Sequence, residues 1–246
     1  MPKKRLISGT APTSMVVGGS TMLSRRTYSR LTMPPMKVSD RRDERPPDPD
    51  SEAPRALSPR FDEALMLASE LHARQLRKGT GIPYVSHVLG VASIALEHGA
   101  DEETAIAALL HDAIEDQGGA ATERLIEDRF GARVAAIVRA CSDTDEIPKP
   151  PWRARKVTYI AHMASADRAS LLVSASDKLH NARTILADLR ADGPSVWDRF
   201  SGGRDGTLWY YRALVTAFRA HPDHLLRLVD ELDRSVTAIE DVARGE

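Results

Sequence analysis

Cysteine is almost absent from this chain of 246 residues, with Cys141 as its one representative. A single thiol excludes an intrachain disulfide framework and a zinc site built from four cysteines, and it is typical of a reducing compartment. We therefore expect a cytoplasmic location. Aromatic residues are also scarce, at 5%, whereas apolar residues make up 42% of the sequence. The chain can bury a sizeable core, which must consist mainly of Ala, Leu, Val and Ile.

Long apolar runs and an excess of positive charge are missing as well. No run approaches the roughly 18 residues that a membrane span needs. The net charge of −1 conceals an asymmetry: residues 1–60 carry 12 basic and 6 acidic side chains (+6), and residues 61–246 carry 22 and 29 (−7). An acidic body does not suit non-specific binding of nucleic acid. We expect neither a membrane nor a nucleic acid as partner, and the oligomeric state stays open.

The first part of the chain is rich in Ser, Thr, Pro, Gly and Arg and has no sustained apolar period. This composition predicts a disordered, basic and Pro-rich tail over residues 1–57, followed by a single domain over residues 58–246. Residues 1–39 hold seven basic side chains and no acid. An organelle-targeting peptide and a start assigned too early are the alternatives for this segment.

From Ser58 onward, apolar residues recur at helical spacing. Ser58 and Pro59 are a typical helix start. Helices are expected from 59 to about 71, through 88–95, over 102–116, 121–130, 132–141, 153–165 and 168–190, with two more from Trp209 to the end. Alternation typical of strands is absent from the sequence. The pattern predicts an all-α bundle of roughly eight helices.

Polar side chains interrupt three segments that should be buried. His87 begins the second predicted helix, His111 and Asp112 directly follow an apolar run, and Asp177 lies inside another. Burying a carboxylate costs several kcal/mol unless it is paired or bound to a metal. Two imidazoles with two carboxylates form a nitrogen and oxygen donor set that suits Mn²⁺, Fe²⁺ or Zn²⁺.

Helical spacing adds polar neighbours to these residues. Glu115 lies one turn beyond His111, Asp116 one turn beyond Asp112, and Asn181 one turn beyond Asp177. Such groups can orient a water molecule or accept a proton beside a metal. His72 and His180 also lie near these positions, and we assign them structural roles.

The order His87, His111–Asp112 and Asp177 resembles the H…HD…D signature of the HD-domain metal-dependent phosphohydrolases. Four stretches are similar to the hydrolase domain of RelA/SpoT-type alarmone enzymes, which include stand-alone small hydrolases and the metazoan SpoT homologue. They are RKGTGIPYVSH at 77–87, AALLHDAIED at 107–116, FGARV at 130–134 and SDKLHNAR at 176–183. The resemblance covers about residues 61–215 and implies the all-α HD-domain fold.

The resemblance also implies roles for individual residues. His87, His111, Asp112 and Asp177 match the four metal ligands, and the metal is usually Mn²⁺, with Fe²⁺ and Zn²⁺ as alternatives here. Glu115 and Asp116 match the catalytic acidic pair that positions and activates the attacking water. Residues that match nucleotide contacts are Arg77, Lys78 and Asn181.

Two further positions bear on the nucleotide pocket. The stretch LWYYR at 208–212 is predicted to form a wall of the pocket with Tyr211 against the substrate, and aromatic helix core is the alternative. Gln117 stands where the family usually has threonine, so the loop over the site should differ.

The function implied is metal-dependent hydrolysis of the 3′-diphosphate of ppGpp or pppGpp, giving GDP or GTP and pyrophosphate, with no synthetase domain. An HD phosphohydrolase of another substrate, such as a dNMP, a dNTP or NADPH, is the alternative with the same fold and metal site. A non-catalytic nucleotide-sensing module is a third hypothesis. It predicts loss of a metal ligand or of the acidic pair, and the sequence keeps all of them.

Overall fold

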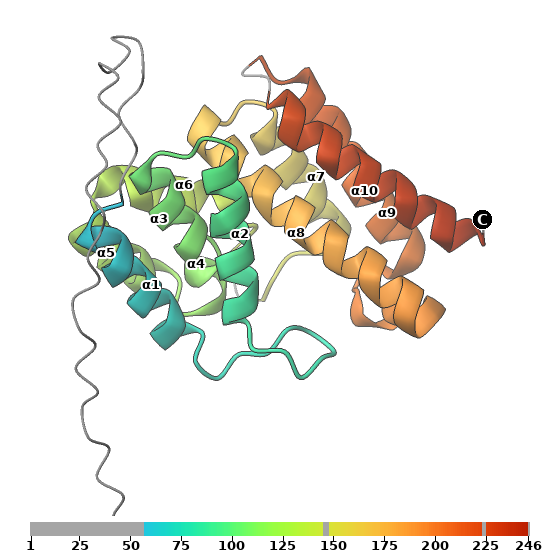
Figure 1. Ribbon diagram of the computed structural model, residues 1–246, viewed down its shortest axis with the longest axis horizontal. Helices are drawn as coiled ribbons and strands as arrows, with labels where there is room; N and C mark the ends of the chain where they lie inside the picture. Colours follow the sequence, from blue (N-terminus) through green and yellow to red (C-terminus); the bar gives the residue numbers. More distant parts are fainter. Residues whose placement is uncertain (1–56, 145–147, 223–224, 246) are drawn as a thin grey trace, which may run out of the picture. The chain divides into compact units, whose positions relative to one another are not determined.

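The computed structural model describes residues 57–144, 148–222 and 225–245. Within these ranges the chain forms ten α-helices and one 3₁₀ helix, and no strand (Figure 1). The all-α prediction is confirmed. The helices are α1 (Pro59–Leu71), α2 (Val85–Glu97), α3 (Glu102–Leu110), α4 (Ala113–Asp116), α5 (Ala120–Phe130), α6 (Ala132–Cys141), α7 (Trp152–Met163), α8 (Arg168–Asp192), η1 (Gly193–Arg199), α9 (Gly203–Ala220) and α10 (Leu226–Arg244).

Short polar side chains begin three of these helices. The hydroxyl of Ser58 accepts a hydrogen bond from the backbone N–H of Arg60, and Pro59 follows at the first helical position, as predicted. Asp101 caps α3 by accepting from the N–H of Thr104, and Asp167 caps α8 in the same manner. Each cap satisfies backbone donors that have no partner inside the helix.

Two helices form the centre of the bundle. Every residue of α3 from Thr104 to Leu110 is buried, and so is every residue of α8 from Ser170 to Asp177. In Figure 1, α8 runs between α2 and α10, and it packs against both of them as well as against α3 and α6. Because α8 is buried on several sides, a carboxylate on it needs a partner within the bundle.

The predicted helix over 102–116 is interrupted, which corrects the sequence-based expectation. α3 ends at Leu110, and the short α4 begins at Ala113. Asp112 has φ −96° and ψ −3°, which takes the chain out of regular helical geometry. Successive residues of a continuous helix point about 100° apart, so the break allows the side chains of His111 and Asp112 to reach one centre. The one-turn spacing survives, since the N–H of Asp116 donates to the carbonyl of Asp112 over 2.9 Å.

The segment between α1 and α2 is a narrow loop closed at its base. Leu76 and Pro83 form an isolated β-bridge, and the N–H of Arg77 donates to the carbonyl of Ile82 over 2.8 Å. Gly79 at the tip of the loop has φ +73°, and a Cβ added there would lie 2.8 Å from the side-chain stem of Arg199 in η1. The loop therefore rests on η1 at a position that only glycine fits.

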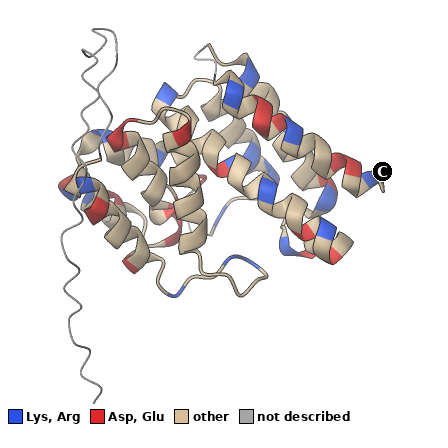
Figure 2. Cartoon of the chain, viewed as in Figure 1, with Lys and Arg blue, Asp and Glu red and all other residues tan. Residues whose placement is uncertain are grey.

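The predicted tail lies outside the described residues, apart from Leu57. None of the helices in the described ranges is both long and apolar enough to cross a membrane. Acidic and basic side chains are interspersed along α10 (Figure 2), where Arg212 of α9 pairs with Glu240.

Candidate active site

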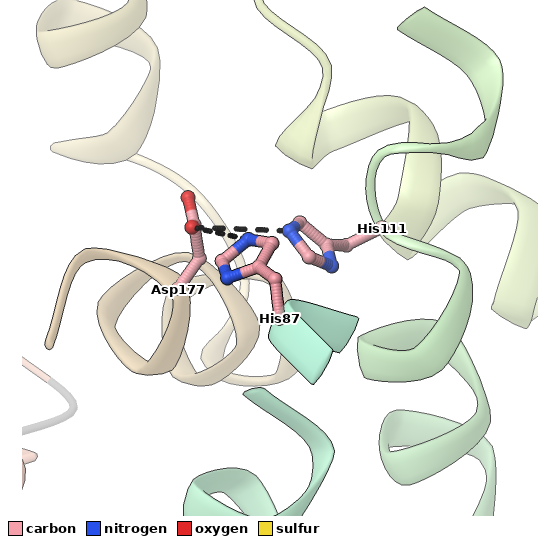
Figure 3. Close-up of side chains that lie close together, drawn as sticks. All are labelled: His87, His111 and Asp177. Atoms are coloured by element: carbon pink, nitrogen blue, oxygen red, sulfur yellow. Dashed lines mark ion pairs between the residues drawn. The ribbon is translucent and has the colours of Figure 1, made fainter. Parts of the chain in front are cut away.

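Three helices bring together two imidazoles and a carboxylate. Figure 3 shows His87 from α2, His111 after α3 and Asp177 from α8 facing one another. Oδ1 of Asp177 lies 3.2 Å from Nε2 of His87 and 3.8 Å from Nε2 of His111. Each of these three buried residues offers one ligand atom, and the three atoms lie within 4.8 Å of one another. The arrangement is one that can hold a divalent cation.

Asp112 completes the group of four predicted ligands. Its Oδ2 lies 2.9 Å from Nε2 of His111 and 3.5 Å from Nε2 of His87. The hydroxyl of Tyr84, the residue before α2, donates to the same oxygen over 2.5 Å. All four residues that the sequence predicts as ligands therefore converge, and one of them has an outer hydrogen-bond partner that fixes its orientation.

The His111 ring is oriented so that Nε2 faces the cluster. Its Nδ1 lies 2.9 Å from the carbonyl oxygen of Ala108, and because a carbonyl only accepts, Nδ1 carries the proton. Nε2 is buried and lies 2.9 Å from Oδ2 of Asp112. Burial lowers the pKa of this imidazole, but the charges of Asp112 and Asp177 outweigh burial and raise the pKa to about 9. The site thus attracts a positive charge at Nε2, and the residues present fit a metal ion.

The two carboxyls of the cluster are held in the charged form. Burial opposes ionisation of both, but the charge of His111 lowers the pKa of Asp112, and the charge of Lys178 lowers the pKa of Asp177. Nζ of Lys178 lies 2.5 Å from Oδ2 of Asp177. The negative charge is therefore available at Oδ1, the oxygen that faces the two imidazoles.

His180 touches the cluster, although only a structural role is predicted for it from the sequence. Its Nδ1 lies 3.0 Å from Nδ1 of His87, on the side of that ring away from the carboxylates. Burial, followed by the nearby charge of His87, lowers the pKa of His180 to about 4. His180 is therefore neutral at neutral pH, and its Nδ1 can accept a hydrogen bond from a protonated Nδ1 of His87.

The predicted catalytic acids lie on α4, beside the cluster. Glu115 accepts hydrogen bonds from Nζ of Lys149 over 2.8 Å and from the backbone N–H of Asp143 over 3.2 Å. Asp116 accepts from Nε2 of Gln75 over 2.7 Å. Burial and then the charge of Asp112 raise the pKa of Asp116, which makes its carboxylate a better proton acceptor.

Asp116 is positioned through a chain of amides. Oε1 of Gln75 accepts from Nε2 of Gln117 over 2.5 Å, and Nδ1 of His72 lies 2.7 Å from the same oxygen. Gln117 therefore acts on Asp116 through Gln75.

A cavity of about 580 Å³ opens next to the cluster of histidine and aspartate side chains, within the usual size range of small-molecule sites. Asn181 links the two: its Nδ2 donates to Oδ1 of Asp177, and its Oδ1 accepts from Nη2 of Arg77 over 2.8 Å. Other lining residues are Lys78, Tyr84, Glu115, His180 and Tyr211.

The four predicted nucleotide contacts and Glu115 thus border the same cavity. Tyr211 does so while 7% exposed, so it belongs to the helix core as well as to the wall. The neighbouring Tyr210 and Trp152 also line the cavity, whereas Trp209, which packs against Trp152, does not.

Basic side chains from α7 reach the cavity from the other side. Arg155 and Lys156 both pair with the buried carboxylate of Asp143, and all three residues line the cavity with Lys178. Together with Arg77 and Lys78, the basic side chains of Arg155, Lys156 and Lys178 make the pocket cationic, although residues 61–246 carry a net negative charge. Such a pocket suits a phosphorylated ligand.

Tyr84, Gln75 and His180 are among the contacts that sequence reasoning missed. His180 follows Asp177 by three residues and Tyr84 precedes His87 by three, so helical spacing offered a signal for both. Gln75 offered no such signal, since it lies in the loop between α1 and α2 and meets Asp116 through tertiary structure alone.

The chain is similar to several known proteins. The family model described as HD domain matches residues 64–208. The guanosine-3′,5′-bis(diphosphate) 3′-pyrophosphohydrolase MESH1 of Danio rerio is 36% identical over 138 residues, which are 55% of this chain and 72% of that protein. The guanosine-3′,5′-bis(diphosphate) 3′-pyrophosphohydrolase of Aquifex aeolicus is 38% identical over 122 residues, which are 50% of this chain. The chain spans 17% of the length of that relative.

A solved structure has a similar fold. It is a metazoan orthologue of SpoT that hydrolyses ppGpp and has a role in starvation responses. The TM-score is 0.60 at 30% sequence identity, and the match covers 73% of this chain and 96% of the other.

Proposed function

Because this chain belongs to the HD-domain family, we propose that it is a metal-dependent hydrolase of guanosine 3′-diphosphate alarmones, which converts ppGpp or pppGpp into GDP or GTP and pyrophosphate. Its relatives of known name act on this substrate class. The observation that carries the proposal is the chain of contacts from Asp177 through Asn181 to Arg77, which joins the cation-binding cluster to a cationic cavity.

His87, His111, Asp112 and Asp177 would hold the ion, for which we propose Mn²⁺, with Fe²⁺ and Zn²⁺ as alternatives that suit the same donors. When bound, a divalent ion supplies Lewis acidity and neutralises the charge that develops on the phosphoryl oxygens. The outer partners Tyr84 and His180 keep the donors in place.

The remaining chemistry belongs to the acidic pair and the cationic pocket. In this proposal Asp116, whose pKa is raised, accepts a proton from the attacking water, while Glu115 orients that water. The water oxygen bonds to the phosphorus attached to the 3′ oxygen, and the bond from that phosphorus to the 3′ oxygen breaks. The 3′ oxygen leaves as a hydroxyl once it has gained a proton, and the other product is pyrophosphate. Arg77, Lys78, Asn181 and Tyr211 are the proposed nucleotide contacts.

A substrate panel tests the proposal. The full chain loaded with Mn²⁺ is assayed with ppGpp, GTP, dNTPs, dNMPs and NADPH, with separate readouts of pyrophosphate and orthophosphate. We expect pyrophosphate and GDP from ppGpp. We also expect at least about a hundredfold loss of kcat in Glu115→Gln and Asp116→Asn. Glu127→Gln, an exposed acid on α5, is the matched control.

The alternatives give different results in the same assay. Release of phosphate from a dNMP, dNTP or NADPH with ppGpp left intact would overturn the substrate and keep the fold and the ion. Binding of ppGpp without turnover would favour the nucleotide-sensing module. A cytoplasmic location remains a prediction from cysteine content, and cell fractionation would test it.

A further inference from the structure

The two histidines His87 and His180 meet across the interface of α2 and α8. Their Nδ1 atoms are 3.0 Å apart, and their ring centroids are 4.9 Å apart. His87 is almost completely buried and turns its Nε2 toward Asp177 and Asp112. The Nδ1 of His87 therefore faces another imidazole, while its Nε2 faces the carboxylates.

The direction of the proton between the two rings follows from the role of Nε2. A histidine that ligates a cation through Nε2 carries its proton on Nδ1 and donates it to an outer acceptor. In the structure the hydrogen-bond partner of that nitrogen is Nδ1 of His180, which must then present its lone pair and hold its own proton on Nε2. Each ring fixes the tautomer of the other.

Gly90 makes room for this arrangement. It lies three residues after His87 on α2, and His180 lies three residues after Asp177 on α8, so both pairs face one another across the interface. A Cβ added to Gly90 would lie 2.2 Å from Cδ2 and 2.3 Å from Nε2 of His180. Glycine inside a helix is unfavourable relative to alanine. The close approach of the ring explains why a glycine stands there.

We propose that His180 is a positioning residue, which holds His87 in the tautomer and direction needed to bind a divalent cation, and that Gly90 supplies the space for its ring. The inference rests on the metal site of the proposed function but not on the choice of substrate. Loss of an outer partner of a metal-binding histidine typically weakens metal binding about 10- to 100-fold.

Calorimetric titration of the metal-free full chain with Mn²⁺ tests the inference without any nucleotide. We expect His180→Ala to bind Mn²⁺ at least about tenfold more weakly than the wild type. His180→Asn should recover most of the affinity, because the asparagine side-chain oxygen can accept a hydrogen bond from Nδ1 of His87 near the place that Nδ1 of His180 occupies. Ser93→Ala, at an exposed position of α2, serves as the control for a substitution in that helix.

A double-mutant cycle separates the clash from a general effect on α2. Gly90→Ala should weaken Mn²⁺ binding in the wild-type background, although alanine favours the helix. In the His180→Ala background the added Cβ meets no ring, so Gly90→Ala should change the affinity little. Thermal unfolding followed by circular dichroism shows that each variant is folded.

Three results would overturn the inference. They are an unchanged Mn²⁺ affinity in His180→Ala, failure of His180→Asn to bind better than His180→Ala, and equal effects of Gly90→Ala in both backgrounds. The proposed function fails separately. Mn²⁺ binding with the expected cycle but no hydrolysis of ppGpp would refute the substrate and leave the role of His180 intact.

Discussion

The hydroxyl of Tyr84 donates a 2.5 Å hydrogen bond to Oδ2 of Asp112, and that oxygen is also 2.9 Å from Nε2 of His111. Burial and the charge of Asp112 both raise the pKa of Tyr84, so the hydroxyl keeps its proton and remains a donor. Tyr84 also contacts the rings of His72 and His87. One tyrosine thus orients a carboxylate and packs against an imidazole of the same cluster.

Tyr84→Phe should keep the ring contacts and remove the hydrogen bond. We expect Mn²⁺ affinity to fall about tenfold, because Asp112 loses the partner that orients it. Calorimetric titration measures the change. Tyr210→Phe is a matched control for metal affinity, since the buried Tyr210 hydroxyl makes no hydrogen bond within the described part of the chain. Equal affinities of Tyr84→Phe and the wild type would refute the orienting role.

Gln75→Leu should act on Asp116 rather than on the ion. Burial and the charge of Asp112 raise the pKa of Asp116, and the hydrogen bond from Gln75 partly offsets them by lowering it. Removing the amide should raise this pKa further. If Asp116 works as a carboxylate, the acidic limb of the pH–rate profile then moves to higher pH, and kcat at neutral pH falls about tenfold.

The pH–rate profile of Gln117→Leu should show a weaker form of the effect expected for Gln75→Leu. Gln117 holds the Gln75 amide through a 2.5 Å hydrogen bond and makes none to Asp116 within the described structure. Its removal should shift the acidic limb in the same direction by a smaller amount. A shift toward lower pH in either variant would contradict the assignment of Asp116 as the proton acceptor.

Gly79→Ala should strain the loop that carries Arg77 and Lys78. The positive φ of Gly79 and the contact with the stem of Arg199 both oppose a Cβ. We expect a loss of about 1–3 kcal/mol in the free energy of unfolding. A raised KM should accompany it, because the two basic residues shift. Urea unfolding and steady-state kinetics measure these effects. Gly81→Ala is the stability control, since a Cβ there meets nothing within 4 Å.

Asp101→Asn should change the response of the fold to acid. Partial burial raises the pKa of Asp101, but hydrogen bonds from Arg133 and Thr104 outweigh burial and lower it from 3.8 to about 2. A carboxyl with a lowered folded-state pKa stabilises the protein above pH 4, and this contribution disappears as the pH falls toward 2. Asparagine keeps the cap but not the charge.

The effect of Asp101→Asn should be small, because about half of the Asp101 side chain is exposed. We expect up to about 1 kcal/mol at pH 7 that vanishes near pH 2. Denaturant unfolding at several pH values measures it. The same difference in stability between the two proteins at every pH would contradict this account.

The convergence of His87, His111, Asp112 and Asp177 could be predicted from the sequence because polar side chains interrupt apolar segments at these positions. His111 and Asp112 follow the buried residues of α3, and Asp177 lies among the buried residues of α8. Burial makes a charged side chain conspicuous in a sequence, since it needs a nearby partner. The all-α fold follows from the same periodic pattern, together with caps such as Ser58.

The outer partners could not be identified in this way. Gln75 meets Asp116 only because a loop after α1 folds over α4, and His180 meets His87 only because α2 packs on α8. The break between α3 and α4 was missed because Ala113 and Ile114 continue the helical pattern of the preceding residues. Local propensity favours one helix there, whereas the side chains of His111 and Asp112 turn toward a common centre.

The four donors come from α2, from the junction of α3 and α4, and from α8. An ion bound by them would therefore act as a cross-link between segments far apart along the chain, and unfolding would have to release it. Free ion at a hundred times its dissociation constant adds about 2.7 kcal/mol to the stability of a protein that binds it only when folded. The melting temperature should then report the free concentration of the ion, and chelation should lower the stability of the whole bundle along with its activity.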